Sequence, residues 1–425
     1  MMYKCIYKVG EFIRNNKISK HYKRLKLEQY YSDDELKKVQ TERLRKLIRH
    51  AKETTAYYQV AFKNINVDTF EVEDLYQIPI LTKKKFRENS SDFFSNKFKK
   101  KDCFYSETSG SSGEPLVFYR DRDWDAAHRA AILRGYSWHD VKPWNRSIYF
   151  WGFMFSPLSK LKVRILDLLQ NRYRVFTYTD ESFGKIVEKV ESSEYIEGYS
   201  SSINKLATTV IDKNISVDSK KLKLIKCTSE KIYDSYKHNV KVAFGKDIVS
   251  EYGAAETGII AFSCEKGEMH ITEENVILEI VDGRAVVTNL FSFSMPLIRY
   301  DLGDYVSISS ERCQCGRKHR LVKDVLGRVG KDILGEKEIY PSLVLYYIFK
   351  KLAINYNIAL SYQGVQYKSG HLTIYLYPDG ELSSLISSKI LEVCSEFFKD
   401  DIIVSIETKN PVDRNEKMKD FVSYL

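Results

Sequence analysis

The chain has 425 residues, of which 43% are hydrophobic and 29% charged, and it carries a net charge of +10. This length is too great for one compact core and suits a large domain with a smaller one, and the composition excludes disordered and fibrous classes. The basic residues are dispersed and form no recognisable nucleic-acid-binding module, so we expect no nucleic-acid partner.

The sequence also indicates the compartment and the relation to the membrane. No stretch is long and apolar enough to span a bilayer, and the N-terminus lacks the features of a signal peptide. The seven cysteines are scattered, which favours a reducing compartment over a disulfide framework. We therefore expect a cytoplasmic protein without a transmembrane segment.

The first 60 residues show helical periodicity. In the first predicted helix, over 3–16, one stripe is apolar, and it consists of Cys5, Ile6, Val9, Phe12 and Ile13. Such a stripe fits a helix lying on a membrane surface or one packed on its own domain. Packing is the commoner case, and it is what we expect; peripheral membrane contact is the alternative.

The middle of the chain alternates helical patterns with short apolar runs at 147–150, 222–227 and 247–251, which predicts an α/β domain with parallel strands. From Met269 the pattern changes to short β segments at 270–272, 276–281 and 285–289, with a turn at Asp282-Gly283. From Ile333 the order is helix, strand, strand, helix, strand. This predicts a small C-terminal α+β unit.

Residues 108–115 interleave glycines with small hydroxyl residues, between strand-like segments at 102–106 and 116–119. Glycine lets a backbone approach phosphate closely, and N–H and hydroxyl groups then point at its oxygens. The segment is neither a nucleotide P-loop nor a nucleophile elbow. We interpret it as a phosphate-holding hairpin loop, with an ordinary flexible loop as the alternative.

Four later segments carry further candidate chemistry. In 251–258, Glu256 follows an apolar strand and could hold magnesium, although a capped turn would show the same pattern. In 299–304, Asp304 could accept two hydrogen bonds from a ribose, although a turn aspartate is as good an explanation. Residues 327–332 contain two glycines beside the domain junction and could form a hinge, and 413–419 is a charged segment near the C-terminus.

With these five segments in this order, the chain resembles the adenylate-forming superfamily of acyl-CoA synthetases and adenylation domains. Within it, the likeness is to phenylacetate-CoA ligases and related CapK-like capsular polysaccharide proteins, over nearly the whole chain. The resemblance implies a large ATP- and acyl-binding α/β domain with parallel sheets and a β subdomain (1–327), a hinge (328–332) and a small mobile α+β domain (333–425).

The resemblance also implies roles for particular residues. ATP phosphates would be held by Thr108, Ser109, Gly110, Ser111, Ser112 and Gly113. Adenine and the acyl pocket would be contacted by Tyr252 and Gly253, with Ala254, Trp151 and Phe153 also lining the pocket. Glu256 would bind magnesium, Thr257 would contact the α-phosphate, and Asp304 would accept hydrogen bonds from the ribose. Arg328 would lie at the hinge, and Lys417 would be the adenylation lysine.

The implied reaction is ATP- and magnesium-dependent activation of a carboxylic acid as acyl-AMP, followed by transfer to CoA or another thiol. Two alternatives stay open: a sugar or carrier-protein acceptor in cell-surface polysaccharide biosynthesis, and a non-catalytic scaffold that keeps the fold. The chain departs from the family pattern at Glu114, Gly330 and Glu416, which keeps the scaffold in consideration. Relatives of this family are often dimers, so the resemblance leaves the oligomeric state open between a monomer and a homodimer.

A second metal is suggested by cysteine and histidine spacing. Cys313-Gln314-Cys315 has two thiols, and Cys264 and His270 lie upstream. Thiolates and imidazoles bind zinc tetrahedrally when four converge, and relatives in this branch have cysteines in the same region. We interpret Cys264, His270, Cys313 and Cys315 as ligands of a structural zinc, with reduced surface cysteines as the alternative.

Overall fold

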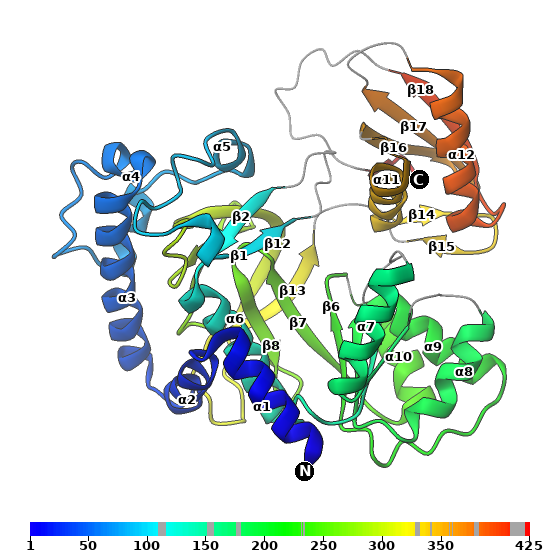
Figure 1. The fold of residues 1–425 in the computed structure, drawn as a ribbon, viewed down its shortest axis with the longest axis horizontal. Coiled ribbons are helices and arrows are strands. Elements are labelled where there is room, and N and C mark those ends of the chain that lie inside the picture. The colour runs from blue at the N-terminus through cyan, green and yellow to red at the C-terminus, as the bar shows by residue number, and fades with distance from the viewer. Residues whose placement is uncertain are drawn as a thin grey trace. The chain divides into compact units, whose positions relative to one another are not determined.

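The structure is a computed structural model of the chain (Figure 1). It describes all residues except 109–115, 151–156, 176–179, 231, 233, 328–331, 341, 357, 359, 378–381 and 409–420. The chain divides into two compact units: Met1–Ser106 with Phe118–Gly327, and Glu107–Val117 with Arg328–Leu425. We call them the large and the small unit. Whether the junction acts as a hinge stays a prediction.

An 11-stranded mixed sheet forms the centre of the large unit, in the order β10-β11-β12-β13-β9-β8-β7-β6-β5-β3-β4. Its strands are β3 (Ser147–Phe150), β4 (Arg172–Arg174), β5 (Tyr195–Tyr199), β6 (Leu224–Thr228), β7 (Ile248–Ala254), β8 (Gly258–Ser263), β9 (Met269–Ile271), β10 (Val276–Val281), β11 (Arg284–Asn289), β12 (Tyr300–Ser309) and β13 (Leu321–Gly327). A separate two-stranded sheet pairs β1 (Phe104–Glu107) with β2 (Val117–Arg120).

Helices of the large unit pack on this sheet, and those near the N-terminus, such as α3 and α4, lie beside it (Figure 1). They are α1 (Met2–Asn15), α2 (Ile18–Glu28), α3 (Asp33–Thr54), α4 (Ala56–Ala61), η1 (Val72–Gln77), α5 (Lys83–Glu88), η2 (Lys100–Asp102), α6 (Arg122–Trp138), α7 (Pro157–Leu169), α8 (Asp180–Val190), α9 (Ser200–Asp212) and α10 (Asp234–Phe244). Within the described residues, no helix has both the length and the apolarity needed to cross a membrane.

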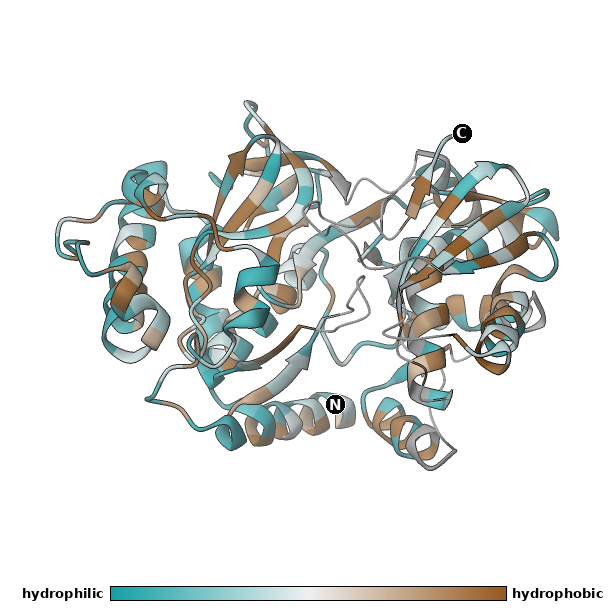
Figure 2. Cartoon of the chain, turned by 90° about the horizontal axis from the view of Figure 1, so that it is seen from above, coloured by the Kyte–Doolittle hydropathy of each residue, from teal (hydrophilic) through white to brown (hydrophobic). Residues whose placement is uncertain are grey.

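The strands β4, β3, β5, β6 and β7 are parallel neighbours and are covered on both faces. One face packs Ile148, Ile196 and Ile225 against apolar residues of α8, α9 and α10. The other face packs Tyr195 and Leu224 against α6. Burial on two faces explains why these strands read as nearly continuous apolar runs in the sequence. Figure 2 colours each residue by hydropathy and shows brown, apolar segments in both strands and helices.

The small unit contains a four-stranded sheet in the order β18-β17-β16-β19, with two helices packed on it. Its elements are β14 (Ile333–Leu334), β15 (Ile339–Tyr340), α11 (Leu343–Tyr356), β16 (Ser361–Lys368), β17 (His371–Tyr377), α12 (Ser384–Phe398), β18 (Ile403–Thr408) and β19 (Phe421–Ser423). The predicted helix–strand–strand–helix–strand order is confirmed, and the short strands β14, β15 and β19 were not predicted.

The predicted β segments after Met269 are confirmed, and β8 and β9 join them to the parallel strands in one sheet. One expectation requires correction. The first helix exists, but its apolar stripe does not pack on its own domain. Val9, Phe12 and Ile13 are exposed, whereas the polar Glu11 and Asn15 are buried, because the residues beneath the helix are polar.

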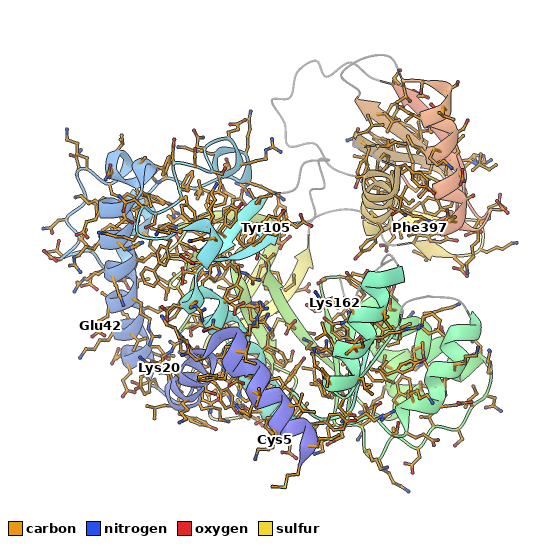
Figure 3. All side chains as sticks on the ribbon, in the orientation of Figure 1. Cys5, Lys20, Glu42, Tyr105, Lys162 and Phe397 are labelled. Carbon is orange, nitrogen blue, oxygen red and sulfur yellow. The ribbon has the colours of Figure 1, made fainter. Side chains whose placement is uncertain are left out.

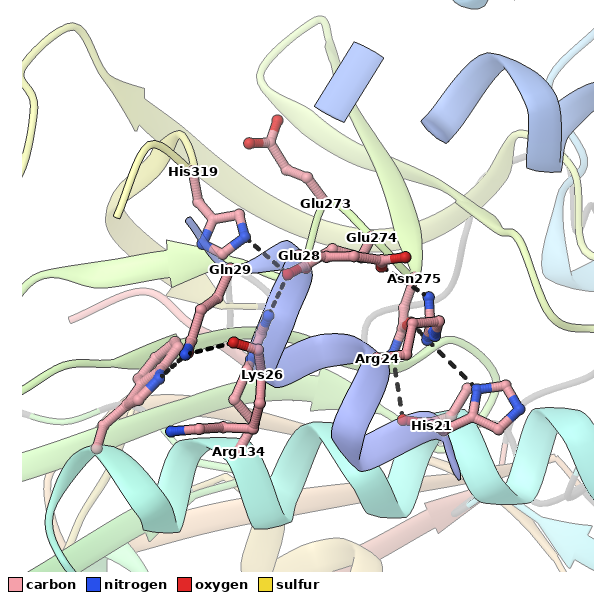
Figure 4. A network of polar contacts seen from close by, with 12 residues as sticks. His21, Arg24, Lys26, Glu28, Gln29, Arg134, Glu273, Glu274, Asn275 and His319 are labelled. Atoms are coloured by element: carbon pink, nitrogen blue, oxygen red, sulfur yellow. Dashed lines mark hydrogen bonds and ion pairs between the residues drawn. The ribbon is translucent and has the colours of Figure 1, made fainter. Parts of the chain in front are cut away.

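A buried ionic network joins α2 and α6 to the loop between β9 and β10 (Figure 4). Glu274 pairs with Arg134 and lies 2.9 Å from His319 Nε2, and all three side chains are almost fully buried. Burial works to raise the pKa of Glu274, but Arg134 and His319 outweigh it and hold this pKa well below its ordinary 4.5. Removing one partner would leave a buried charge uncompensated.

We therefore expect Glu274→Gln to destabilise the chain by about 3–5 kcal/mol. The folded-state pKa is depressed, so the carboxylate stabilises the fold above the ordinary pKa of 4.5, and this contribution is lost as the pH falls below it. Urea unfolding of both proteins at several pH values would measure a gap that narrows in acid. Glu73→Gln, at the exposed Lys37–Glu73 pair, is the matched control and should leave unfolding unchanged. A gap independent of pH would contradict the assignment.

Candidate functional site

At strand β7, the pairing in the central sheet changes from parallel to antiparallel. It runs parallel to β6 on one side and antiparallel to β8 on the other. A turn of three residues, 255–257, connects β7 to β8 and carries Glu256 and Thr257. These side chains thus lie at the carboxyl end of a parallel strand, where ligands bind in open α/β sheets. The segment is a β-hairpin, so the alternative of a capped turn from strand to helix is wrong.

Gly253 is required by the close approach of the two strands of this hairpin. A Cβ atom at this position would lie 2.4 Å from the carbonyl oxygen of Gly258. The pairing register also shifts between Tyr252 and Gly253. The irregular pairing therefore depends on the absence of a side chain here, and it sets the direction in which the following residues leave the strand.

The Glu256 carboxylate is buried, with 5% of its residue surface exposed. The hydroxyl of Tyr300, at the start of β12, donates a hydrogen bond of 3.1 Å to Glu256 Oε1. The Tyr300 side chain is itself buried and contacts the ring of Phe86 at a centroid distance of 6.1 Å. A carboxylate held in position by a hydrogen bond is a suitable donor for Mg²⁺.

The turn itself is held by Asn289, the last residue of β11. Its side-chain amide donates to the carbonyl oxygens of Glu256 and Thr257, at 3.4 and 3.2 Å. The Thr257 hydroxyl is buried and has no hydrogen-bond partner among the described residues. A buried hydroxyl that could donate to a ligand fits the predicted contact with an α-phosphate oxygen.

Asp304 is held by a tyrosine in the same way as Glu256. The Tyr252 hydroxyl, from β7, donates to Asp304 Oδ2 at 3.1 Å. Asp304 lies within β12 and not in a turn, so the alternative of a turn aspartate is wrong. The two motifs are therefore cross-linked twice, because each contributes one carboxylate and one tyrosine that binds the carboxylate of the other.

A row of buried charges crosses the parallel strands beside this hairpin. Lys226 of β6 lies 3.0 Å from both Glu197 of β5 and Glu251 of β7, and the Tyr136 hydroxyl donates to Glu197. Burial alone would lower the pKa of Lys226, but the two carboxylates raise it above its ordinary value. Lys226 thus remains charged and ties together the three strands that lead into the site.

The structure brings together the four residues predicted to bind zinc. One ligand atom from each of Cys264, His270, Cys313 and Cys315 lies within 4.8 Å of the others. Cys264 follows β8, His270 is in β9, and the other two lie in the turn between β12 and β13. Burial lowers the pKa of His270 to about 3, so its imidazole is neutral and able to ligate.

The backbone around the cysteines also suits a metal. The N–H groups of Lys266 and Cys315 donate to the sulfurs of Cys264 and Cys313, at 3.3 and 3.4 Å. Such donors stabilise thiolates. Burial raises the pKa of Cys264 to about 12, so a nearby cation would be needed to deprotonate it at neutral pH. The donor set and the geometry therefore fit a tetrahedral soft-metal site.

The other predicted site residues divide into two groups. Thr108 belongs to the small unit, where its backbone N–H and side-chain oxygen both bond to Leu116 and close the base of the predicted phosphate loop. Ala254 ends β7. The remaining predicted residues lie outside the described part of the chain, and they are Ser109, Gly110, Ser111, Ser112, Gly113, Trp151, Phe153, Arg328 and Lys417.

Sequence reasoning missed the supporting residues of the site. Lys226 and Glu197 could have been found, because each interrupts an otherwise apolar strand pattern. Tyr300 and Asn289 gave no such signal. Their roles depend on which strands become neighbours, and this is not visible in a single sequence.

The architecture defines the class: the chain has the fold of the adenylate-forming ligases. It matches 2-hydroxyisobutyryl-CoA ligase in complex with 2-HIB-AMP and CoA in the thioesterification state, with a TM-score of 0.65, 16% identity, and 93% of this chain and 91% of that chain covered. The same ligase in the postadenylation state, with R3-HIB-AMP, matches with a TM-score of 0.59, 17% identity, and 93% and 90% covered.

Two curated proteins resemble the chain in sequence. The chain is 22% identical to Protein CapK of Staphylococcus aureus over 345 residues, which is 77% of this chain and 75% of the relative. It is 24% identical to a phenylacetate-coenzyme A ligase of Thermus thermophilus over 353 residues, 73% and 74% respectively. No family model matches. The predicted fold class and the resemblance to adenylate-forming enzymes are confirmed.

We expect Gly253→Ala to destabilise the chain by about 1–3 kcal/mol, because the new methyl group would collide with the Gly258 backbone. Differential scanning calorimetry would record a lower unfolding temperature. Gly10→Ala in α1 is the control, since a Cβ atom added at Gly10 would meet nothing within 4 Å; a helical Gly→Ala change there should be neutral or slightly stabilising. Equal midpoints for Gly253→Ala and wild type would show that the hairpin tolerates a side chain.

Proposed function

We propose that this chain uses ATP and Mg²⁺ to activate a carboxylic acid as an acyl-adenylate and then transfers the acyl group to CoA or another thiol. The double cross-link between Tyr252, Asp304, Tyr300 and Glu256 carries this proposal. It fixes one carboxylate in the turn between β7 and β8 and one on β12, as required by a site that must hold a magnesium ion and a ribose at set positions. The relatives include a CoA ligase, which supports the same chemistry.

In the first step, a carboxylate oxygen of the acid attacks the α-phosphorus of ATP, a new P–O bond forms, and the bond to pyrophosphate breaks. Mg²⁺ would neutralise phosphate charge when bound. Glu256 would ligate it, Thr257 would donate to an α-phosphate oxygen, and Asp304 would accept hydrogen bonds from the ribose hydroxyls. Lys417 would stabilise the charge that develops on the reacting oxygens, since a lysine is a compact point charge.

In the second step, the acceptor attacks the acyl carbon and AMP leaves. Rotation of the small unit about 328–332 would exchange the groups that serve the two steps. A sugar or carrier-protein acceptor is the second candidate, and the similarity to CapK favours it. The acceptor does not change the first step, so adenylation can be tested separately.

We further propose that Cys264, His270, Cys313 and Cys315 bind one structural zinc ion. Two sulfurs, Cys264 Sγ and Cys313 Sγ, are 3.6 Å apart, and Cys315 Sγ lies 3.3 Å from His270 Nε2. The ligands come from the end of β8, from β9 and from the turn between β12 and β13. The ion would therefore cross-link neighbouring strands of the antiparallel part of the sheet.

Acid-dependent ATP–pyrophosphate exchange, measured with a panel of aryl, fatty and amino acids, should reveal activity with one class. Glu256→Gln and Lys417→Ala should each reduce the exchange by at least about 100-fold, because each removes a charge that acts on the phosphates. Exchange that survives both changes would overturn the site assignment. No exchange with any acid, in a protein that still binds ATP, would favour the non-catalytic scaffold.

Tyr300→Phe tests the cross-link more finely. It keeps the buried ring and removes only the hydroxyl that positions Glu256, so we expect about a tenfold fall in kcat and a higher Mg²⁺ requirement. Tyr305→Phe is the matched control on the same strand, and its side chain is partly exposed. A normal magnesium requirement in Tyr300→Phe would show that this hydrogen bond does not position the carboxylate.

Metal analysis of protein purified without chelator should find about one zinc per chain. Cys313→Ser should lower the zinc content and the unfolding temperature together, because metal binding is coupled to folding. Cys5→Ser, at an exposed cysteine of α1, is the control and should change neither. A wild-type protein that retains no zinc and is insensitive to added zinc would contradict the proposal.

A further inference from the structure

Two helices of the large unit present their apolar sides to solvent. On α1, the exposed apolar residues fall on one stripe at helical spacing, and they are Met2, Cys5, Val9, Phe12 and Ile13. On α7, the exposed apolar residues are Leu161, Ile165, Leu166, Leu168 and Leu169. Single exposed apolar residues need no explanation, but a gathered set marks an interaction surface.

The two helices are adjacent. They are in contact with each other, and both lie toward the viewer in Figure 1. Figure 3 labels Cys5 on α1 and Lys162 on α7. We call the combined surface the α1–α7 apolar face. Exposure is substantial across it: Phe12 and Ile13 are 70% and 74% exposed, and Leu168 is 69% exposed.

Polar contacts on the buried sides of α1 and α7 explain why their apolar sides face solvent. Asn15 donates to the carbonyl of Arg122 at 2.7 Å and to Asp125 at 3.2 Å, and Arg14 pairs with Asp125 at 3.1 Å. On α7, the buried Asp167 pairs with Arg174 at 2.7 Å. Both helices are thus attached through polar contacts, and the exposed apolar residues named above do not contribute to the core of the unit.

Charge identifies the occupant of this face. Among the side chains described on α1 and α7, every exposed charged residue is basic: Lys4, Lys8, Arg14, Lys162 and Arg164. Of these, Lys8 pairs with Glu11 and Arg14 pairs with Asp125. The two acidic residues, Glu11 and Asp167, are buried. By helical spacing, Lys8 borders one side of the α1 stripe and Arg164 borders one side of the α7 stripe, whereas Arg14 lies nearer the buried side of α1. An apolar stripe with basic borders is the pattern of a helix that lies in the interface of an anionic bilayer.

We propose that the α1–α7 apolar face docks on an anionic lipid surface, with Phe12, Ile13 and Leu168 entering the region between headgroups and acyl chains. A second copy of this chain fits the face less well. A twofold contact would place the same basic residues opposite one another, and like charges disfavour such a contact. The proposal does not depend on the acid-activating function, because none of these residues belongs to that site.

The test is flotation of the full chain with vesicles of phosphatidylcholine alone and of phosphatidylcholine mixed with phosphatidylglycerol. The wild type should float with the mixed vesicles, less so at high salt, and not with phosphatidylcholine alone. The double variant Phe12→Ser/Ile13→Ser should lose more than about tenfold in vesicle affinity, because two apolar side chains leave the bilayer. Ile165→Ser/Leu168→Ser on α7 should behave likewise.

Val60→Ser is the matched control, since Val60 is an 80% exposed residue on α4, and it should float as the wild type does. Circular dichroism and ATP–pyrophosphate exchange would show that the variants remain folded. Equal flotation of wild type and both double variants, or no binding to the anionic vesicles, would overturn the proposal. Loss of a wild-type dimer in Phe12→Ser/Ile13→Ser, detected by light scattering without any vesicle binding, would assign the face to a second copy instead.

Discussion

The reciprocal pair of tyrosine–carboxylate hydrogen bonds is the constraint on which the candidate site depends. Tyr252 of β7 binds Asp304 of β12, and Tyr300 of β12 binds Glu256 in the turn after β7, so each segment presents one acid whose position is set by the other. These strands are not neighbours in the sheet, since β13, β9 and β8 lie between them. The hydrogen bonds therefore join motifs that the sheet ladder does not bring into contact. Each acid is oriented before a ligand arrives, which reduces the entropy that binding must overcome.

The same unit contains a polar interior that is unusual beneath surface helices. Lys226 lies between Glu197 and Glu251, Arg134 pairs with Glu274, and Asp167 pairs with Arg174. Buried ion pairs contribute little net stability, but breaking one is costly, so they favour a single arrangement of the elements they join. One consequence is the orientation of α1 and α7. Because these helices are attached through polar contacts, their apolar residues are free to serve another purpose.

The features of the fold and of the site that could be predicted are those whose sequence pattern lies within one short segment. The strand 147–150, the turn at Asp282-Gly283 and the small α+β unit follow from spacing and turn chemistry, and both turn residues have the left-handed backbone that such a turn needs. The cysteines and His270 were named from residue type, and the fold gathered them. Tyr300 and Asn289 could not be named, because their partners are set by strand order. The outward stripe of α1 was misjudged because amphipathicity gives a helix two sides without saying which one the protein covers.

The uncertainty over which side of α1 is buried has a physical origin. A helix buries whichever side matches the surface beneath it, and here that surface carries Asp125, Arg172 and Arg174 beside Asn15 and Asp167. Polar attachment is weaker per unit area than apolar burial, so it would be a poor choice for stability alone. It becomes advantageous when the exposed apolar side binds something else. The site at the end of β7 and the α1–α7 apolar face share no residue, so the proposed acid-activating centre and the proposed lipid-docking surface can be altered separately within one unit.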